Sequence, residues 1–218
     1  MTIPHYTIVP FYKRLLSYIY PIMVNKLEGA LSVQLYLSRN QFQLATNDAI
    51  YSDGDRYSPA IAIANNLKVF LPTVKNVLML GSGLGSMVQV MHKRGLHPLF
   101  TLVEKDNVVL QLSMEIFGTK HFTGIAPVCN DALPFMEQNM EKYDLIFVDI
   151  FDSRIVPAFV TTELFLNLCH KNLKPDGRLA INYMINYKPE WKIVKQLFTR
   201  IFVNHKELNL GRNRIFIV

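Results

Sequence analysis

Carboxylates follow three apolar runs of this sequence, either directly or one residue after the run ends. Glu104 follows Leu-Phe-Thr-Leu-Val, Asp131 follows Ala-Pro-Val-Cys-Asn, and Asp149 follows Tyr-Asp-Leu-Ile-Phe-Val. A carboxylate accepts hydrogen bonds from hydroxyl and amine groups and can take a proton from either. If the runs are parallel strands, their carboxyl ends meet at one edge of a sheet, where ligands bind. We therefore expect these side chains, together with Asp152, to converge in one cleft.

A glycine-rich turn follows the apolar run at residues 75–80. The run is typical of a buried strand of a parallel sheet. The glycines permit a sharp turn and a close approach of the backbone to a ligand, and residues 86–94 predict a helix. A strand, a glycine turn and a helix N-terminus make a nucleotide site, because free backbone N–H groups point at the ligand. The turn consists of Gly81, Ser82, Gly83, Leu84 and Gly85.

The spacing to Glu104 points to an adenosine ligand. Glu104 lies about twenty residues beyond the turn, where a carboxylate accepts hydrogen bonds from both ribose hydroxyls. This spacing fits NAD as well as other adenosine ligands. The dinucleotide fingerprint requires Gly or Ala where this chain has Ser86. It also does not include the pair Asn130-Asp131, whose carboxylate could accept from the exocyclic amine of adenine. The alternative is that each carboxylate caps a helix, which fits Asp106 and Asp131 best.

From residue 75 onward the pattern predicts strands that alternate with helices, which implies βαβ units and a parallel sheet. The expected strands span residues 75–80, 99–103, 126–129, 143–148 and 178–183, with a closing antiparallel pair at 204–208 and 214–218. The expected helices span 86–94, 107–117, 133–140, 162–173 and 189–202, and residues 174–177 are expected to form a turn.

The first third of the chain has a different pattern. Alternating apolar residues predict antiparallel strands at 31–37 and 41–45, with a third short strand at 49–52. Turns are expected at 38–40 and 46–48. A helix is expected from Pro59 to about residue 69, because proline fits the first turn of a helix.

The apolar run from Phe11 to Val24 is interrupted by Lys13, Arg14 and Pro21. It is too short to span a bilayer. We interpret it as a docking or dimer-contact helix, which predicts a homodimer and no membrane partner.

Composition narrows the possible partners. The net charge is +6, but the 23 basic residues form no run longer than two, so we expect no nucleic-acid partner. The histidines and cysteines show no metal-ligand spacing, so we expect no metal. Cys129 and Cys169 lie among apolar residues and are expected to be buried free thiols, which predicts a reducing, cytoplasmic location.

These motifs resemble the spermidine synthase (polyamine aminopropyltransferase) branch of the S-adenosylmethionine-dependent methyltransferase superfamily. The resemblance covers residues 31–218 and includes the glycine turn, residues 53–57, Val103-Glu104, Asp131 and residues 143–152. Thr-Thr-Glu-Leu-Phe and Leu-Lys-Pro-Asp-Gly also match. The resemblance implies an α/β fold, a Rossmann-like seven-stranded methyltransferase sheet with a small N-terminal antiparallel β-appendage. The corresponding domains are residues 1–56 and 57–218.

The resemblance also implies roles for individual residues. Glu104 would bind the ribose and Asp131 the adenine of the donor. Asp149 stands where the family has its proton acceptor, and Asp152 where a carboxylate holds the amine substrate. Tyr57 would line the acceptor pocket with Asp152. The implied cofactor-binding set is Gln43, Gly81, Ser82, Gly83, Leu84, Gly85, Glu104, Lys105, Asn130, Asp131, Ala132 and Asp149.

Leu84 and Ser58-Pro59 depart from the polyamine synthase pattern. Polyamine synthases carry an Asp where this chain has Leu84, and that Asp grips the amine of the decarboxylated donor. Ser58-Pro59 replaces His or Gln followed by Glu. A dicationic polyamine requires paired carboxylates in a cleft, and this sequence lacks two of them. Leu84 is compatible with S-adenosylmethionine itself, whose carboxylate an Asp would repel.

We therefore predict an S-adenosylmethionine-dependent transferase that methylates a small-molecule amine or hydroxyl acceptor. The reaction would be direct displacement at a sulfonium-bound carbon, with an Asp as the proton acceptor. The alternative is aminopropyl transfer from decarboxylated S-adenosylmethionine to a diamine. A third possibility is a non-catalytic family member that binds a nucleoside or serves as an assembly subunit.

Overall fold

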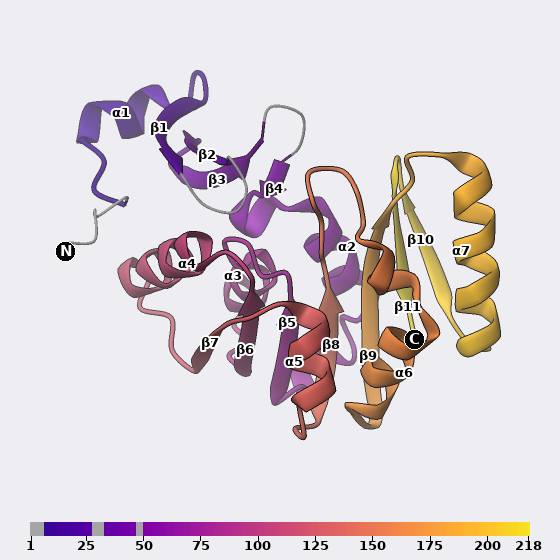
Figure 1. The fold of residues 1–218 in the computed structure, drawn as a ribbon. Helices are drawn as coiled ribbons and strands as arrows, with labels where there is room; N and C mark the ends of the chain where they lie inside the picture. Colours follow the sequence, from indigo (N-terminus) through magenta and orange to yellow (C-terminus); the bar gives the residue numbers. More distant parts are fainter. Residues whose placement is uncertain (1–6, 28–32, 47–49) are drawn as a thin grey trace.

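The computed structural model describes residues 7–27, 33–46 and 50–218. Within these ranges the chain forms a large sheet covered by helices on both faces and a small antiparallel sheet beside it (Figure 1). The predicted turn at 46–48 lies largely outside the described residues. The predicted division of the chain between residues 56 and 57 stays a prediction.

The large sheet has seven strands in the order β10-β11-β9-β8-β5-β6-β7. β5 lies between β6 and β8 and runs parallel to both, so the chain changes direction in the sheet at the carboxyl ends of β5 and β8. Such a switch point is where α/β sheets bind ligands. The expected seven-stranded methyltransferase-type sheet is thus confirmed. The strands are β5 (Asn76–Leu80), β6 (Leu99–Glu104), β7 (Ile125–Cys129), β8 (Tyr143–Val148), β9 (Leu173–Met184), β10 (Lys206–Leu210) and β11 (Asn213–Ile217).

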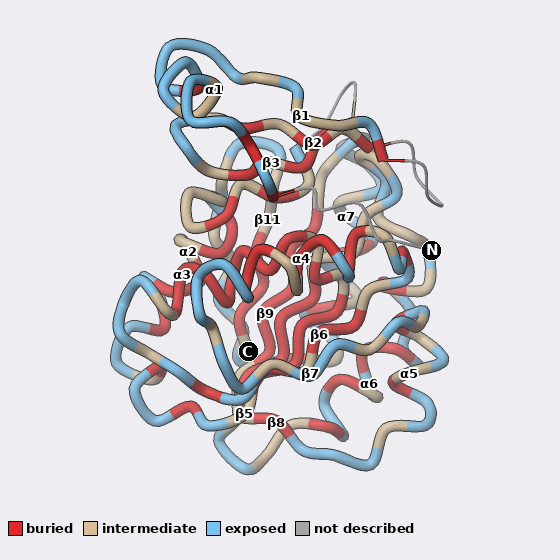
Figure 2. Tube along the Cα trace, turned by 90° about the vertical axis from the view of Figure 1, so that its left-hand side faces the viewer, coloured by how far each residue is buried: buried red, intermediate tan, exposed pale blue. Residues whose placement is uncertain are grey.

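The helices cover both faces of this sheet because its strands are apolar on both sides. In β5, Val77 and Met79 belong to one buried cluster, and Leu78 and Leu80 belong to another. The alternation follows the two-residue period of a strand. Figure 2 shows the strands as a buried layer inside the molecule. The first face packs against α2 (Ser58–Asn66), α3 (Ser86–Lys93) and α4 (Asn107–Thr119), and the second against α5 (Ala132–Gln138), α6 (Glu163–Lys171) and α7 (Lys188–Ile201).

The small sheet has four antiparallel strands in chain order. Its apolar residues alternate, so that Leu35, Leu37 and Leu44 are buried on one face. They share a buried cluster with Leu112 of α4 and with Leu84 of the glycine turn. The small sheet is therefore fixed to the large domain next to the switch point. Its strands are β1 (Ile22–Leu27), β2 (Val33–Ser38), β3 (Gln41–Ala45) and β4 (Ile50–Ser52).

Three expectations about local structure were wrong. The run at 11–24 is not one helix, since α1 spans only Phe11–Leu16 and residues 22–27 form the edge strand β1. The predicted turn at 174–177 lies inside β9, where a register shift accommodates it and Asp176 takes a φ of 62°. Cys129 is exposed because β7 is the edge strand of the large sheet, whereas Cys169 is buried.

The glycine turn is closely packed, and this generates a prediction about stability. Gly81 has a φ of +77°, and a Cβ there would lie 2.4 Å from the backbone oxygen of Asp149. Gly95 has a similar φ of +73° but no atom within 4 Å of such a Cβ. We expect Gly95→Ala to cost about 1–2 kcal/mol through the left-handed backbone alone.

Gly81→Ala should cost several kcal/mol more, because β5 or the Asp149 backbone must shift as well. The measurement is urea unfolding of both variants. Equal losses would show that the backbone of Asp149 is free to move away from Gly81.

Candidate active site

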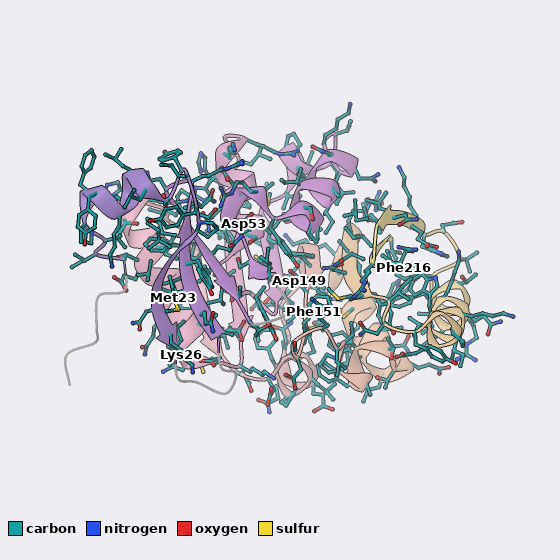
Figure 3. The ribbon with its side chains drawn as sticks, turned by 90° about the horizontal axis from the view of Figure 1, so that it is seen from above. Met23, Lys26, Asp53, Asp149, Phe151 and Phe216 are labelled. Carbon is teal, nitrogen blue, oxygen red and sulfur yellow. The ribbon has the colours of Figure 1, made fainter. Side chains whose placement is uncertain are left out.

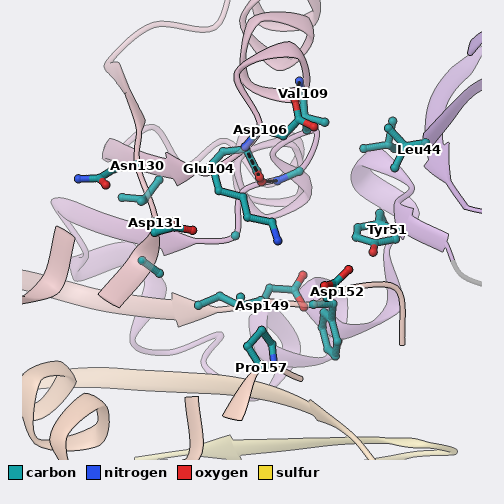
Figure 4. Close-up of a pocket in the computed structure, with 18 of the residues that line it drawn as sticks. Leu44, Tyr51, Glu104, Asp106, Val109, Asn130, Asp131, Asp149, Asp152 and Pro157 are labelled. Carbon is teal, nitrogen blue, oxygen red and sulfur yellow. Dashed lines mark hydrogen bonds between the residues drawn. The ribbon is translucent and has the colours of Figure 1, made fainter. Parts of the chain in front are cut away.

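A cavity of about 240 Å³ lies at the carboxyl ends of β5, β6, β7 and β8 (Figure 4). Asn130 and Asp131 lie at one end, and Leu44 and Tyr51 at the other. In the view of Figure 3, Asp149 lies between the small sheet and the part of the large sheet that carries Phe216. The cavity is lined by Val33, Leu44, Tyr51, Gly81, Gly83, Val103, Glu104, Lys105, Asp106, Val109, Asn130, Asp131, Ala132, Asp149, Ile150, Phe151, Asp152, Pro157 and Phe159.

Glu104, at the end of β6, is held by two backbone N–H groups. Gly83 donates to its Oε2 at 3.0 Å and Asp106 donates to its Oε1 at 3.2 Å. Burial raises the pKa of this carboxyl, and the two N–H donors lower it. The hydrogen bond from Gly83 holds Glu104 beside the glycine turn. The sequence had predicted that the turn and this carboxylate would lie close together.

Asp106 follows β6 and Asp131 follows β7, and their side chains differ in the hydrogen bonds that they make to the helices after them. Asp106 caps α4, because its side chain accepts from the backbone N–H groups of Val108 and Val109. Asp131 precedes α5 but makes no side-chain hydrogen bond to that helix. The helix-cap interpretation is therefore confirmed for Asp106 and wrong for Asp131. The carboxylate of Asp131 instead lines the cavity.

Only part of the glycine turn reaches the cavity. Gly81 and Gly83 line it, whereas Ser82, Leu84 and Gly85 do not. Leu84 is fully buried with the apolar residues of the small sheet and α4. Gly85 has a φ of +65°, and a Cβ there would lie 2.2 Å from the Phe117 ring. Leu84, which was predicted to contact the donor, therefore lies in the core, because the small sheet covers that side of the turn.

Asp149, at the end of β8, is the centre of a buried polar network. Its Oδ1 accepts from the amide of Asn182 at 2.8 Å and from the hydroxyl of Tyr57 at 3.2 Å. Asn213 donates to Asn182 Oδ1 at 2.9 Å, which orients the Asn182 amide toward Asp149. The described residues provide no hydrogen bond to Asp149 Oδ2, so this oxygen is available to the cavity.

The pKa of Asp149 is raised to about 7. Burial is the main cause, and the charge of Glu104 adds to it, while the hydrogen bonds from Asn182 and Tyr57 oppose it. Burial next to Asp149 also raises the pKa of Tyr57, so the phenol stays a proton donor. A carboxyl with a pKa near 7 can act as a general base at neutral pH.

Two predicted residues lie elsewhere than expected. Gln43 occupies the face of β3 opposite to the buried Leu44 and does not line the cavity. Tyr57 lies behind Asp149 rather than at the cavity wall. The wall tyrosine is Tyr51 of β4, whose hydroxyl accepts a hydrogen bond from the backbone N–H of Ser153.

Sequence reasoning missed Tyr51 and Asn182. Tyr51 lies two residues before residues 53–57, which resemble the family. An aromatic residue so close to that stretch was the available signal. Asn182 lies in the apolar strand β9 and is only 1% exposed. A polar residue at such a position requires a buried partner, which was the available signal.

Asp152 lies in the segment after β8, in a tight turn closed by reciprocal backbone hydrogen bonds with Ile155 at 2.8 and 3.0 Å. Its side chain is exposed at the cavity and lies near Tyr51 (Figure 4).

Within the ranges that the structure describes, no helix is both long and apolar enough to cross a membrane.

Solved structures with the same fold include enzymes of two kinds. A probable spermidine synthase from Corynebacterium glutamicum superposes with a TM-score of 0.74 at 19% identity, covering 91% of this chain and 80% of that one. Human methyltransferase-like protein 13 in complex with SAH gives 0.59 at 19% identity, covering 73% and 78%. These likenesses define the class as a methyltransferase-like Rossmann fold.

The family follows from the sequence match. Residues 60–204 match the Spermine/spermidine synthase domain. The chain belongs to the spermine/spermidine synthase family, as its motifs predicted.

Two curated relatives represent different transferases. The polyamine aminopropyltransferase of Lachnospira eligens is 28% identical over 153 residues, which cover 66% of this chain and 52% of the relative. The N-terminal histidine N-methyltransferase of Emericella nidulans is 30% identical over 113 residues, covering 50% and 20%. The chain thus spans about half or less of these relatives.

The raised pKa of Asp149 predicts a pH-dependent stability. Between the ordinary pKa of 3.8 and about 7, the unfolded chain releases this proton while the folded chain keeps it. The free energy of unfolding therefore falls as pH rises through this window, by about 4 kcal/mol as an upper bound. Asp149→Asn should remove this fall.

The measurement is urea unfolding of both proteins at pH 5 and pH 8. The variant should gain stability relative to the natural chain as pH rises. Parallel losses in the two proteins would mean that Asp149 titrates near its ordinary pKa.

Proposed function

We propose that this chain binds S-adenosylmethionine in the cavity and transfers its methyl group to a small amine or hydroxyl acceptor. The observation that carries the proposal is the meeting of Glu104, Asp131 and Asp149 in one cavity beside the glycine turn. Family membership supports a sulfonium nucleoside as the donor.

The donor's adenosine part fits the end of the cavity at Glu104 and Asn130. Glu104 is positioned by Gly83 and Asp106, and it can accept hydrogen bonds from both ribose hydroxyls. Asp131 makes no hydrogen bond to α5, so its carboxylate is available to the exocyclic amine of adenine. Lys105 and Ala132 complete this end. The bare backbone at Gly81 and Gly83 permits the close approach that a side chain would block.

Asp149 is the proton acceptor in this proposal. The bound donor supplies an electrophilic carbon on a positively charged sulfur. The acceptor's lone pair forms the new bond to that carbon, the carbon–sulfur bond breaks with its electrons on sulfur, and the acceptor's proton passes to Asp149. Tyr57 and Asn182 hold Oδ1 and leave Oδ2 toward the cavity. The pKa near 7 lets Asp149 take a proton at neutral pH.

The choice of methyl transfer rests on position 84. Leu84 is buried in the core and does not line the cavity, so position 84 supplies no carboxylate that could grip the donor's amine or repel its carboxylate. Aminopropyl transfer from decarboxylated S-adenosylmethionine is the second candidate. It is favoured by the family match and by the carboxylates that line the cavity.

A thermal-shift assay distinguishes these donors. We expect S-adenosylmethionine and S-adenosylhomocysteine to raise the melting temperature, and decarboxylated S-adenosylmethionine to raise it less, because ligands that bind only the folded state stabilise it. Glu104→Gln should abolish the shift, since it removes the charged acceptor for the ribose. Glu137→Gln, on the exposed side of α5, is the matched control and should leave it unchanged.

The opposite donor preference would replace methyl transfer by aminopropyl transfer. No shift with any of these nucleosides, nor with methylthioadenosine, would instead support a non-catalytic family member.

We also propose that the protein is a cytoplasmic homodimer with contacts at α1. The two free cysteines support the reducing compartment. Within the described part of the chain no residue of α1 is buried, and an apolar surface exposed in this way is typical of an interface. The exposed large residues here include Ile8, Phe11, Tyr12, Leu15, Tyr18, Ile19 and Tyr20.

Light scattering tests the dimer. Phe11→Ser combined with Ile19→Ser should give a monomer, because these side chains are 75% and 79% exposed in the isolated chain. Val69→Ser with Val203→Ser, which are 83% and 80% exposed elsewhere, should keep the dimer. A monomeric natural chain would exclude this contact.

A further inference from the structure

A groove of about 1140 Å³ lies at the end of the large sheet where β8 and β9 begin. Its walls come from the ends of α2 and α6, the start of β9, the connection between α7 and β10, and the end of β11. β8 has six residues, so at about 3.3 Å per residue roughly 20 Å separates its first residue from Asp149. The groove therefore lies at the opposite end of the sheet from the candidate active site (Figure 1).

Positive side chains predominate in this groove. Among the described residues that line it, Asp176 is the one with a carboxylate side chain. The cations come from separate segments of the chain, which is why no basic run marks the groove in the sequence. The lysines and arginine that line it are Lys142, Lys171, Lys174, Arg178 and Lys206.

The sheet brings these segments together. Tyr143 of β8 pairs with Leu173 of β9, so Lys142 lies beside the start of β9. The ammonium of Lys142 donates a hydrogen bond to the backbone oxygen of Lys171. Lys206 begins β10, and β11 alone separates β10 from β9, which is roughly 10 Å across the sheet. The lysines are therefore neighbours in space although they are distant in the sequence.

Most of this positive charge is not neutralised within the described residues. Lys174 pairs with Asp144 at 3.0 Å. The other four cations of the groove form no ion pair with a described residue. Arg178 donates to backbone oxygens, and the three remaining lysines are exposed. Lys171 lies in the last turn of α6, where a positive charge favours the helix dipole, but this explanation does not extend to the other two.

The size and lining of the groove indicate which kind of polyanion it fits. Its volume exceeds the range of about 300–1,000 Å³ that is usual for small-molecule sites, so a segment of a macromolecule is the better match. Within the described lining there is no Phe, Tyr or Trp on which a nucleic-acid base could stack. Pro175 is exposed and Leu173 is partly exposed, and both offer contacts to apolar side chains.

We propose that this groove binds an acidic peptide segment of a partner protein. The carboxylates of the segment pair with the lysines that have no partner in the chain, and its apolar side chains contact Leu173 and Pro175. Complementary charge of this kind favours association and selects the partner. The inference does not depend on what the candidate active site binds.

Fluorescence anisotropy tests the proposal with a labelled peptide of three Glu-Leu-Asp-Glu repeats. We expect the peptide to bind at about 50 mM NaCl and to bind at least about fivefold more weakly at about 300 mM, because salt screens exposed charges. A peptide of three Gln-Leu-Asn-Gln repeats has nearly the same shape without the charge, and should bind at least about tenfold more weakly. A uridine dodecamer should also bind more weakly than the acidic peptide, because it finds no stacking platform.

Two double variants with the same change in net charge locate the binding surface. Lys142→Glu combined with Lys206→Glu should weaken the acidic peptide by at least about tenfold, since like charges then oppose each other in the groove. Lys26→Glu combined with Lys192→Glu is the matched control, because these lysines are exposed on β1 and α7. The control should change the affinity by no more than about twofold.

Several results would overturn the proposal. One is the absence of acidic-peptide binding at the lower salt concentration, and another is equally tight binding of the neutral peptide. Equal losses in the two double variants would assign the binding to the net charge of the chain rather than to the groove. Tighter binding of the uridine dodecamer would assign the groove to nucleic acid instead.

Discussion

The hydrogen bonds to Asp149 Oδ1 join the end of β8, which lines the cavity, to two residues that lie outside the cavity wall. Asn182 belongs to β9, Tyr57 precedes α2, and Asp149 itself ends β8. A carboxyl in this position loses most of its hydration, and its pKa rises accordingly. The two donors limit this rise, so the group remains able to exchange a proton near neutral pH. The strand order places these residues together, since β8 and β9 are parallel neighbours in the sheet.

Much of the large domain could be predicted because its local and global patterns agree. The strand β8 was predicted with its observed bounds, and the central β5, its turn and α3 were predicted to within a residue or two. The carboxylates at the strand ends follow from the same logic, since a parallel sheet gathers its carboxyl ends. Sequence patterns define such positions well when each strand is buried on both faces.

The directions of individual side chains could not be obtained in the same way. Leu84 points into the core because the small sheet packs over the glycine turn, and no pattern within the turn encodes that contact. Gln43 lies on the face of β3 opposite to Leu44, as the two-residue period of a strand requires. Residues 174–177 have turn composition, and although they lie within the bounds of β9, the pairing of β9 with β8 passes from Leu173 to Arg178 without them. Only for Leu84 does a tertiary contact decide the direction of the side chain.

The position of Leu84 has a consequence for how this fold could change its chemistry over evolutionary time. In the turn, Gly83 borders the ligand cavity while its neighbour Leu84 belongs to the core shared by the small sheet and α4. A charged residue at 84 would therefore have to enter an apolar cluster that also includes Leu35, Leu37 and Leu44. Its acceptance would require compensating changes in the small sheet. A substitution at position 84 is therefore coupled to the packing of the neighbouring small sheet.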